Sequence, residues 1–305
     1  MHHLPLSSIE RRYLMSCKIV STGILFIFLI GCAATTSTTT DTPSELKLEY
    51  RFPPAQQLTY DLSSETREIS EVMGQSIEVK TISSMQFSLL PKGMEGSNSN
   101  VQVTIDSSFL SINHPRGELK ADMAGVIGRS FSMQLSPSGK EMNLKGNEEI
   151  QYTLGPVGKR NATNAFLAIF SDLSEKPVKV GDTWTTKDSI REGGGGMNVL
   201  FIIDGLSRLD GFASKDGYDC ARIVSTFKGT LQGEGTQGPM QLSTKGTMEG
   251  IDTTFFASTK GFLLHSNSFI TLRTTTDASG PQNMTIPGTR TSKMMLSFTG
   301  SGAKK

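Results

Sequence analysis

The chain has 305 residues, a formal net charge of +1 and a charged fraction of only 19%, without long runs of like charge. This balance argues against nucleic acid or an acidic surface as a partner. The length is sufficient for one large β domain or two modest ones, each with a sizeable core. Glycine and methionine are frequent and there is a single tryptophan. Such a composition is typical of a protein with many strands and tight turns rather than of a helical bundle.

The first 31 residues have the organisation of a bacterial export signal. An apolar run at 19–30 has the length of a signal-peptide core and is shorter than the ~20 residues of a membrane-spanning helix. The run ends in L-I-G-C, which resembles the lipobox of bacterial lipoproteins. The resemblance implies cleavage between Gly31 and Cys32 and attachment of lipid, palmitate included, to Cys32. The segment before Met15 is polar and unlike a leader, so Met15 is an alternative translation start.

A polar, threonine-rich stretch follows the lipobox, so that 32–44 comprises the lipidated cysteine and a tether. This stretch has no apolar surface to bury, and we expect it to be flexible. Several acyl chains on Cys32 make a durable anchor, because each buried methylene contributes roughly 0.8 kcal/mol. Ala33 rather than aspartate follows the cysteine, which in the lipoproteins that this leader resembles favours the outer membrane of a two-membrane host. The sequence therefore predicts an exported protein, anchored by lipid in the cell envelope and facing the periplasm.

The rest of the chain is expected to be mainly β, in the β-rich α+β class, with large curved antiparallel sheets. The β-rich domain covers 45–300 and leaves a short tail, 301–305. The hairpin sequence at 131–144 recurs about 120 residues on, at 254–264, so a second division gives two meander-like halves, 45–145 and 196–300, joined by 146–195. Short hairpins of this kind also match by chance, and both divisions stay open.

Strands are predicted where apolar and polar residues alternate. The longest alternation runs from Ile77 to Leu89, and shorter ones cover 58–62 and 101–105. A hairpin is predicted at 131–144, with Gly139 where the turn needs a positive φ. Further strands are predicted at Val199–Leu206, Cys220–Leu231, Met240–Met248, Ile251–Ser258, Phe262–Thr275 and Ser292–Thr299.

Helical segments are predicted only between the two halves. Asn147 is a suitable N-cap for a short helix that ends near Thr153, and Asn161 is a suitable N-cap for a second. Four apolar residues of the second helix fall on one stripe: Phe166, Ile169, Phe170 and Leu173. This stripe is expected to pack on the apolar face of the sheet.

The phrase P-V-K-V-G-D-T-W occupies Pro177–Trp184, and its Gly181-Asp182 pair predicts a two-residue hairpin. The phrase resembles the central P-x-x-V-G-D-x-W motif of a family of uncharacterised bacterial envelope proteins, a domain of unknown function. That family also has an F-x-M-x-[VL]-S-x-x-G hairpin before its central helix, which 131–139 matches. The resemblance covers roughly 58–298 and implies no activity.

Residues suited to chemistry are few. His114 and His265 have no histidine or cysteine at metal-ligand spacing, so no metal or cofactor is predicted. Neither a G-x-S-x-G elbow nor a phosphate-binding loop is present. Cys220 is expected to be an inert buried thiol, Asp182 a turn residue rather than a general acid, and Trp184 a core anchor rather than a ligand-stacking residue. The sequence therefore predicts a protein that is not an enzyme.

Two functions remain open. In the first, the concave apolar face of a curved sheet binds a lipid or other hydrophobic ligand, in fold-level analogy with carrier lipoproteins of bacterial envelopes. It predicts an apolar cavity larger than ~300 Å³, lined by Phe166, Phe170, Met85 and Met133. In the second, the interior is packed, and the chain is a structural or protein-interaction lipoprotein with an exposed apolar patch and an envelope protein as its partner.

Overall fold

The structure is a computed structural model that describes residues 45–54, 56–155, 158–194 and 196–303. The chain divides into two units, 1–42 and 43–305. The expected leader, the lipidation site Cys32 and most of the tether belong to the first unit and lie outside the described residues. Within the described ranges, none of the helical segments has the length and apolarity needed to cross a membrane.

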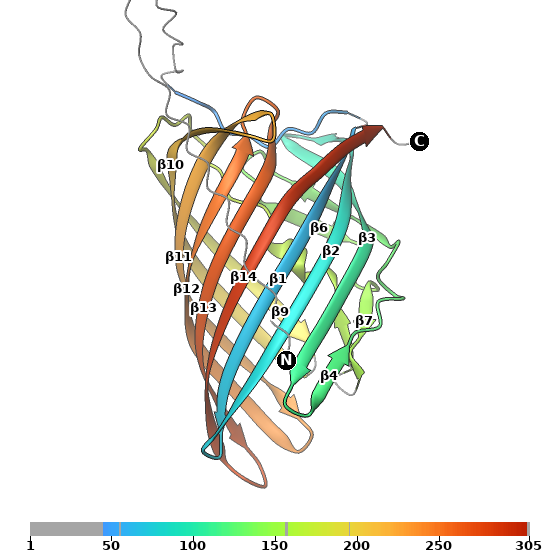
Figure 1. The fold of residues 1–305 in the computed structure, drawn as a ribbon, viewed down its shortest axis with the longest axis vertical. Helices are drawn as coiled ribbons and strands as arrows, with labels where there is room; N and C mark the ends of the chain where they lie inside the picture. Colours follow the sequence, from blue (N-terminus) through green and yellow to red (C-terminus); the bar gives the residue numbers. More distant parts are fainter. Residues whose placement is uncertain (1–44, 55, 156–157, 195, 304–305) are drawn as a thin grey trace, which may run out of the picture. The chain divides into compact units, whose positions relative to one another are not determined.

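The second unit is built on one large antiparallel sheet that curls into an open trough (Figure 1). Its first strands are β1 (Gln56–Val72), β2 (Gln75–Glu95), β3 (Asn98–His114), β4 (Gly117–Lys120), β5 (Ser130–Leu135) and β6 (Glu141–Lys145). Its last strands are β9 (Thr183–Gly194), β10 (Met197–Lys215), β11 (Tyr218–Gln237), β12 (Met240–Ala257), β13 (Phe262–Ser279) and β14 (Met284–Ala303). Between them lie β7 (Gln151–Thr153), β8 (Lys159–Asn161) and the 3₁₀ helix η2 (Thr163–Leu167). The predicted mainly β architecture with a large curved antiparallel sheet is confirmed.

The order of the strands explains why part of the chain lies inside the trough. The sheet runs β6-β5-β3-β2-β1-β14-β13-β12-β11-β10-β9, with β4 paired to β3. The first strand pairs with the last, so the two meanders form one continuous sheet, and β6 and β9 are its opposite edges. The connection between those edges, described over 146–155 and 158–182, crosses the concave side (Figure 1). We call its central part, residues 162–173, the strap.

Two predicted strands of the second half are a single strand. Met240–Met248 and Ile251–Ser258 both belong to β12, which pairs without a break at Gly250 with β11 on one side and β13 on the other. The ring of Phe227 lies against Gly250, where a Cβ atom would clash with it. Gly250 therefore accommodates a close neighbour within the sheet, whereas the sequence pattern suggested a break.

The predicted hairpin at 131–144 is present as β5 and β6. Gly139 has a φ of +100° and donates its N–H to the Ser136 carbonyl oxygen at 3.0 Å. The predicted hairpin at Gly181-Asp182 is wrong, because Val178 pairs with Leu46 instead of with β9. A four-residue turn, Lys179–Asp182, leads from this pairing into β9.

The two central helices are replaced by other structure. Gln151–Thr153 is strand β7, since this segment forms a hairpin with β8 that glycines with positive φ at 155 and 158 make possible. The Asn161 side chain accepts the Thr163 N–H at 2.7 Å, but the N-cap of the next segment is Ala162, which makes no side-chain capping bond. However, one 3₁₀ turn follows rather than an α-helix. The expected burial of the stripe is confirmed, because all four residues are at most 6% exposed: Phe166, Ile169, Phe170 and Leu173.

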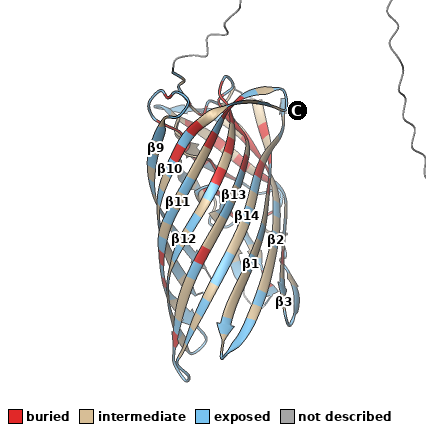
Figure 2. Cartoon of the chain, turned by 60° about the vertical axis from the view of Figure 1, so that its left-hand side comes forward, coloured by how far each residue is buried: buried red, intermediate tan, exposed pale blue. Residues whose placement is uncertain are grey.

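The core lies between the strap and the sheet. Phe166 of the strap packs edge-on against Phe87 and Phe131, with ring centroids 4.9 and 5.1 Å away, and Phe170 packs against Tyr60. Figure 2 shows that most buried residues gather toward one end of the long strands, while intermediate and exposed residues alternate further along. The strap thus fills only part of the trough.

Candidate ligand-binding cavity

A cavity of about 390 Å³ lies between the strap and the inward face of β9–β14. Period-two alternation brings its walls together, since every second side chain of a strand points inward. The apolar lining consists of Leu167, Ile169, Phe170, Ile190, Phe201, Ile203, Phe227, Met248, Ile270 and Met294, with Ala165 and Ala168. Its volume lies within the ~300–1,000 Å³ range of small-molecule sites. The apolar cavity expected between the sheet and the central segment is therefore present.

The ligand-lining residues predicted from the sequence are divided among this cavity, an adjoining cavity and the packed core. Phe170 lines the cavity, and Met85 lines an adjoining one. Phe166 and Met133 are at most 1% exposed and belong to the core, where they support the strap without lining either cavity. The sequence pattern identifies these residues as inward-facing, but it does not distinguish a filled part of the trough from an empty part.

The adjoining cavity has a volume of about 660 Å³ and lies between the strap and β1–β3. Asn164, Ala165 and Glu192 line both cavities, so the two spaces meet beside η2. The second cavity is more polar, because Arg160, Arg290 and several serines and threonines contribute to its wall. An apolar chain therefore finds its best environment in the first cavity, with a polar exit beside it.

Asp252 of β12 is buried in the wall of the apolar cavity. Its Oδ1 accepts hydrogen bonds from the hydroxyls of Ser266 and Ser268, both at 2.6 Å, and its Oδ2 accepts one from Thr254 at 2.6 Å. Ser171 of the strap bonds in turn to the Thr254 hydroxyl at 2.5 Å. The strap is thereby tied to a polar network in the middle of the sheet.

Further carboxylates lie at the two ends of the cavity. Asp172, at the end of the strap, faces Asp188 of β9, and burial together with that neighbouring carboxylate raises the pKa of Asp172 to about 7. Glu192 lies at the other end, and burial raises its pKa, opposed by Arg290. An apolar cavity whose ionisable lining is acidic discriminates between ligands by their charge.

The strap is held at its last residues by groups from three different segments. Both Ile169 and Phe170 donate their N–H groups to Glu141 Oε1 of β6 at 2.9 Å. Tyr50 donates its hydroxyl to the Ser171 carbonyl oxygen, and Trp184 donates its indole N–H to the Asp172 carbonyl oxygen, both at 3.1 Å. These bonds fix the position of the cavity wall.

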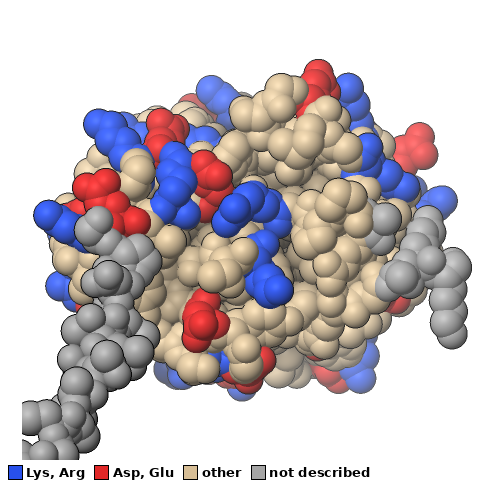
Figure 3. Space-filling view, turned by 90° about the horizontal axis from the view of Figure 1, so that it is seen from above, with Lys and Arg blue, Asp and Glu red and all other residues tan. Residues whose placement is uncertain are grey.

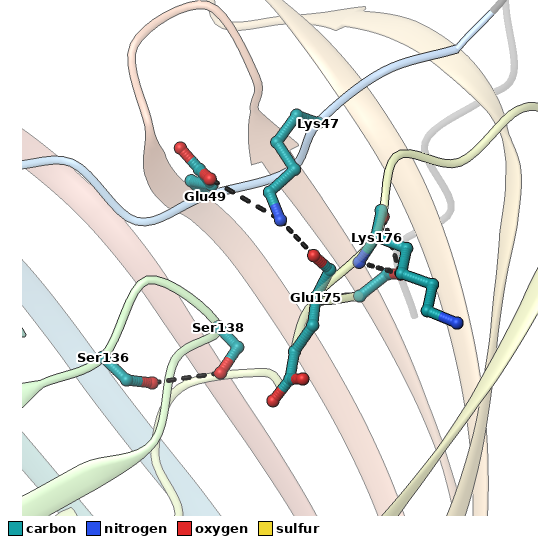
Figure 4. Close-up of polar contacts among 7 residues, drawn as sticks. Lys47, Glu49, Ser136, Ser138, Glu175 and Lys176 are labelled. Atoms are coloured by element: carbon teal, nitrogen blue, oxygen red, sulfur yellow. Dashed lines mark hydrogen bonds and ion pairs between the residues drawn. The ribbon is translucent and has the colours of Figure 1, made fainter. Parts of the chain in front are cut away.

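A polar cavity of about 850 Å³ lies beyond Asp172, at the end of the trough where the strap runs into β9. Figure 4 shows polar contacts at this end: Lys47 lies 3.6 Å from Glu49 and also donates to the Glu175 carbonyl oxygen. Seen from above in Figure 3, side chains of both signs are interspersed over this end. The electrostatic surface here favours neither an anionic nor a cationic macromolecule.

The remaining candidate residues have structural roles. The Asp182 carboxylate accepts the Lys179 N–H at 3.0 Å, which confirms the turn role, and Trp184 packs against the core. Cys220 is 1% exposed, and burial raises the pKa of its thiol, as expected for an inert cysteine. His265 shares a hydrogen bond with Ser297, and His114 accepts the Arg116 N–H. Within the described ranges, no group of His, Cys, Asp or Glu side chains suits a metal ion.

The sequence patterns did not identify the acidic side chains of the cavity. Asp188 and Asp252 stand at inward positions of their strands, in phase with apolar residues such as Ile190 and Met248. A carboxylate in phase with an apolar face is the signal that would have found them. Asp172 lies on irregular backbone, and no periodicity indicates its direction.

Comparisons with known proteins identify no family. No protein-family model matches the chain, and no curated protein matches it. Similar solved structures include an outer membrane channel from Pseudomonas putida F1, at 7% identity and a TM-score of 0.20, over 82% of this chain and 98% of that chain. A DUF1329 family protein from Desulfovibrio piger ATCC 29098 has 11% identity and a TM-score of 0.23, over 80% and 85%. OccK2 from Pseudomonas aeruginosa has 6% identity and a TM-score of 0.22, over 79% and 98%. At such TM-scores these likenesses support no conclusion about function.

Proposed function

We propose that the protein is a non-enzymatic lipoprotein of the bacterial cell envelope that binds a lipid chain or another hydrophobic small molecule. The observation that carries this proposal is the apolar cavity of about 390 Å³ between the strap and β9–β14. The isoleucine, phenylalanine and methionine side chains that the strands contribute to its wall are only half-buried, so a ligand that covers them removes apolar surface from water. Binding in such a site requires no catalytic residue.

The lipid anchor at Cys32 is the second part of the proposal. It rests on the lipobox-like sequence that ends at Cys32 and on the export signal before it. In a two-membrane host the anchored chain belongs to the outer membrane, on its periplasmic side. There the cavity is available to hydrophobic molecules of the envelope.

Cys32→Ala should move the protein from the membrane fraction to the soluble fraction of cells. The substitution removes the thiol that receives the diacylglyceryl group, and with it the acyl chains that hold the protein. Fractionation followed by immunoblotting measures the effect. Cys220→Ala is the matched control and should leave the protein in the membrane fraction. Equal membrane retention of Cys32→Ala and the unmodified chain would count against the anchor.

Native mass spectrometry with lipid extraction tests the binding function. Residues 41–305, expressed without leader and purified without detergent, should carry a hydrophobic molecule in stoichiometric amount or take one up when it is added. An apo mass that persists after addition of apolar ligands would refute the carrier role. It would favour the alternative of an interaction protein, to which the exposed outward side chains Leu206, Ile251 and Phe269 are suited.

A further inference from the structure

The charge of the cavity lining restricts the class of ligand. We propose that the cavity takes a cationic amphiphile, a molecule with an apolar chain and a protonated or quaternary amine. This inference rests on the ligand-binding function proposed above and specifies its ligand. The apolar cavity makes the site, while the groups around it determine which apolar molecule is accepted.

The ionisable residues of the lining are all acidic. Asp172, Asp188, Glu192 and Asp252 contribute to the wall, whereas none of its residues is lysine, arginine or histidine. Asp252 is 8% exposed, and its two oxygens receive hydrogen bonds from serine and threonine hydroxyls only. Hydroxyl donors satisfy the carboxyl oxygens without adding a positive charge to the wall of this apolar space.

The nearest basic groups lie beyond the two ends of the cavity. Arg290, near Glu192, is already bound to Glu68 Oε2 through two hydrogen bonds of 2.9 and 2.7 Å. Lys140 acts on Asp172 from the polar cavity, and its effect on the pKa of Asp172 is smaller than the effects of burial and of Asp188. The middle of the cavity therefore lacks a cation among the described residues.

Three aromatic rings of the lining suit the same ligand. Phe170 on the strap, Phe201 on β10 and Phe227 on β11 border the cavity. The face of an aromatic ring attracts an ammonium or quaternary amine, more strongly where water is excluded. An amine on an apolar chain matches this lining at each point. The apolar walls contact the chain, and the aromatic faces and the carboxylates that lack a cation attract the amine.

The same groups disfavour anionic amphiphiles. A fatty-acid carboxylate or a phosphate in this cavity places an anion beside the acidic side chains of Asp188 and Asp252, and like charges repel each other. A protonated amine instead provides the charge partner that the buried carboxylates lack. Neutral chains of the same length are expected to bind with intermediate affinity.

Equilibrium dialysis of residues 41–305, which contain the whole second unit and lack the apolar leader, against decylamine, decanol and decanoate tests the inference. The three probes share one apolar chain and differ in charge. Decylamine should bind at least about tenfold more tightly than decanoate, and Asp188→Asn should weaken decylamine binding about tenfold while improving decanoate binding. Trp184, the single tryptophan, bonds to the Asp172 carbonyl oxygen and reports binding independently by fluorescence.

Asp204→Asn is the matched control, because Asp204 lies on β10 with its exposed carboxylate paired to Lys187 at 3.2 Å, away from the cavity. It should leave all three affinities unchanged. Decanoate binding as tightly as decylamine, or equal effects of Asp188→Asn and Asp204→Asn, would overturn the inference but leave the binding function intact. Binding of none of the three probes would overturn the binding function itself.

Discussion

Ile203→Trp should reduce the affinity for a decyl-chain ligand by at least about tenfold, a loss of roughly 1.4 kcal/mol or more. Ile203 lies on β10 and its side chain lines the cavity beside Phe201. An indole at this position occupies space that the ligand needs, and the strap above it is held in place by Glu141 and Tyr50. Equilibrium dialysis with decanol, which carries no charge, separates this steric effect from electrostatics.

Ile202→Trp is the control for that substitution. Ile202 is the preceding residue of the same strand, and its side chain points outward and is 51% exposed. The two variants thus receive the same new side chain on opposite faces of the sheet. Thermal unfolding should show both folded, and decanol binding should be lost in one only. Equal affinities of Ile202→Trp and Ile203→Trp would show that decanol does not bind in this cavity.

The trough was predictable from the sequence because its strands alternate regularly. Residues 77–89 identify β2 by period two alone, and the turn glycine at 139 identifies the β5–β6 hairpin. For the cavity, the sequence predicted an apolar space between the sheet and the central segment, but not which residues form its wall. This wall depends on β1 pairing with β14, which places the first and last strands side by side and directs the segment between β6 and β9 across the concave face.

The helix predictions failed for a related reason. Asn161 binds the Thr163 N–H one residue before the N-cap, and η2 ends at Leu167 because the following backbone binds to groups of the sheet rather than to its own turn. The N–H groups of Ile169 and Phe170 reach Glu141, a residue 28 and 29 positions away in the chain. Tertiary hydrogen bonds of this kind replace the local ones that helix propensity describes.

The bond between Glu141 and the strap predicts an unusual dependence of stability on pH. Burial of the carboxyl group is the largest influence and raises the pKa of Glu141 from its ordinary 4.5 to about 8, although the N–H groups of Phe170 and Ile169 favour its ionised form. Below pH 4.5 this carboxyl is protonated in the folded and the unfolded chain. As the pH rises from there to about 8, the unfolded chain releases the proton and the folded chain retains it, so the folded state loses stability.

Glu141→Gln should remove the loss of stability that Glu141 causes as the pH rises. The glutamine Oε1 still accepts the two strap N–H groups, but the side chain has no proton to release in the unfolded chain. The free energy of unfolding of the unmodified protein, relative to the variant, should therefore fall by on the order of 4 kcal/mol between pH 4.5 and 8, since one pKa unit corresponds to about 1.4 kcal/mol. Urea denaturation at a series of pH values measures the difference. Asp172 contributes a loss of the same sign in both proteins, and its charge also raises the pKa of Glu141, so the measured difference includes the interaction of this pair.

Glu118→Gln is the control for this prediction, because the pKa of Glu118 is lowered rather than raised. Glu118 lies on β4, where the Ser111 hydroxyl and Lys120 lower its pKa, so its carboxylate is ionised in both states from pH 6 to 9. Its variant should show a constant stability difference over that range. If Glu141→Gln also gave a constant difference, Glu141 would be ionised at neutral pH and the strap would be held by a charged carboxylate. With the pKa of Glu141 raised to about 8, a neutral carboxyl group holds the strap at neutral pH. At alkaline pH the strap should loosen, and with it the wall of the cavity that a bound ligand contacts.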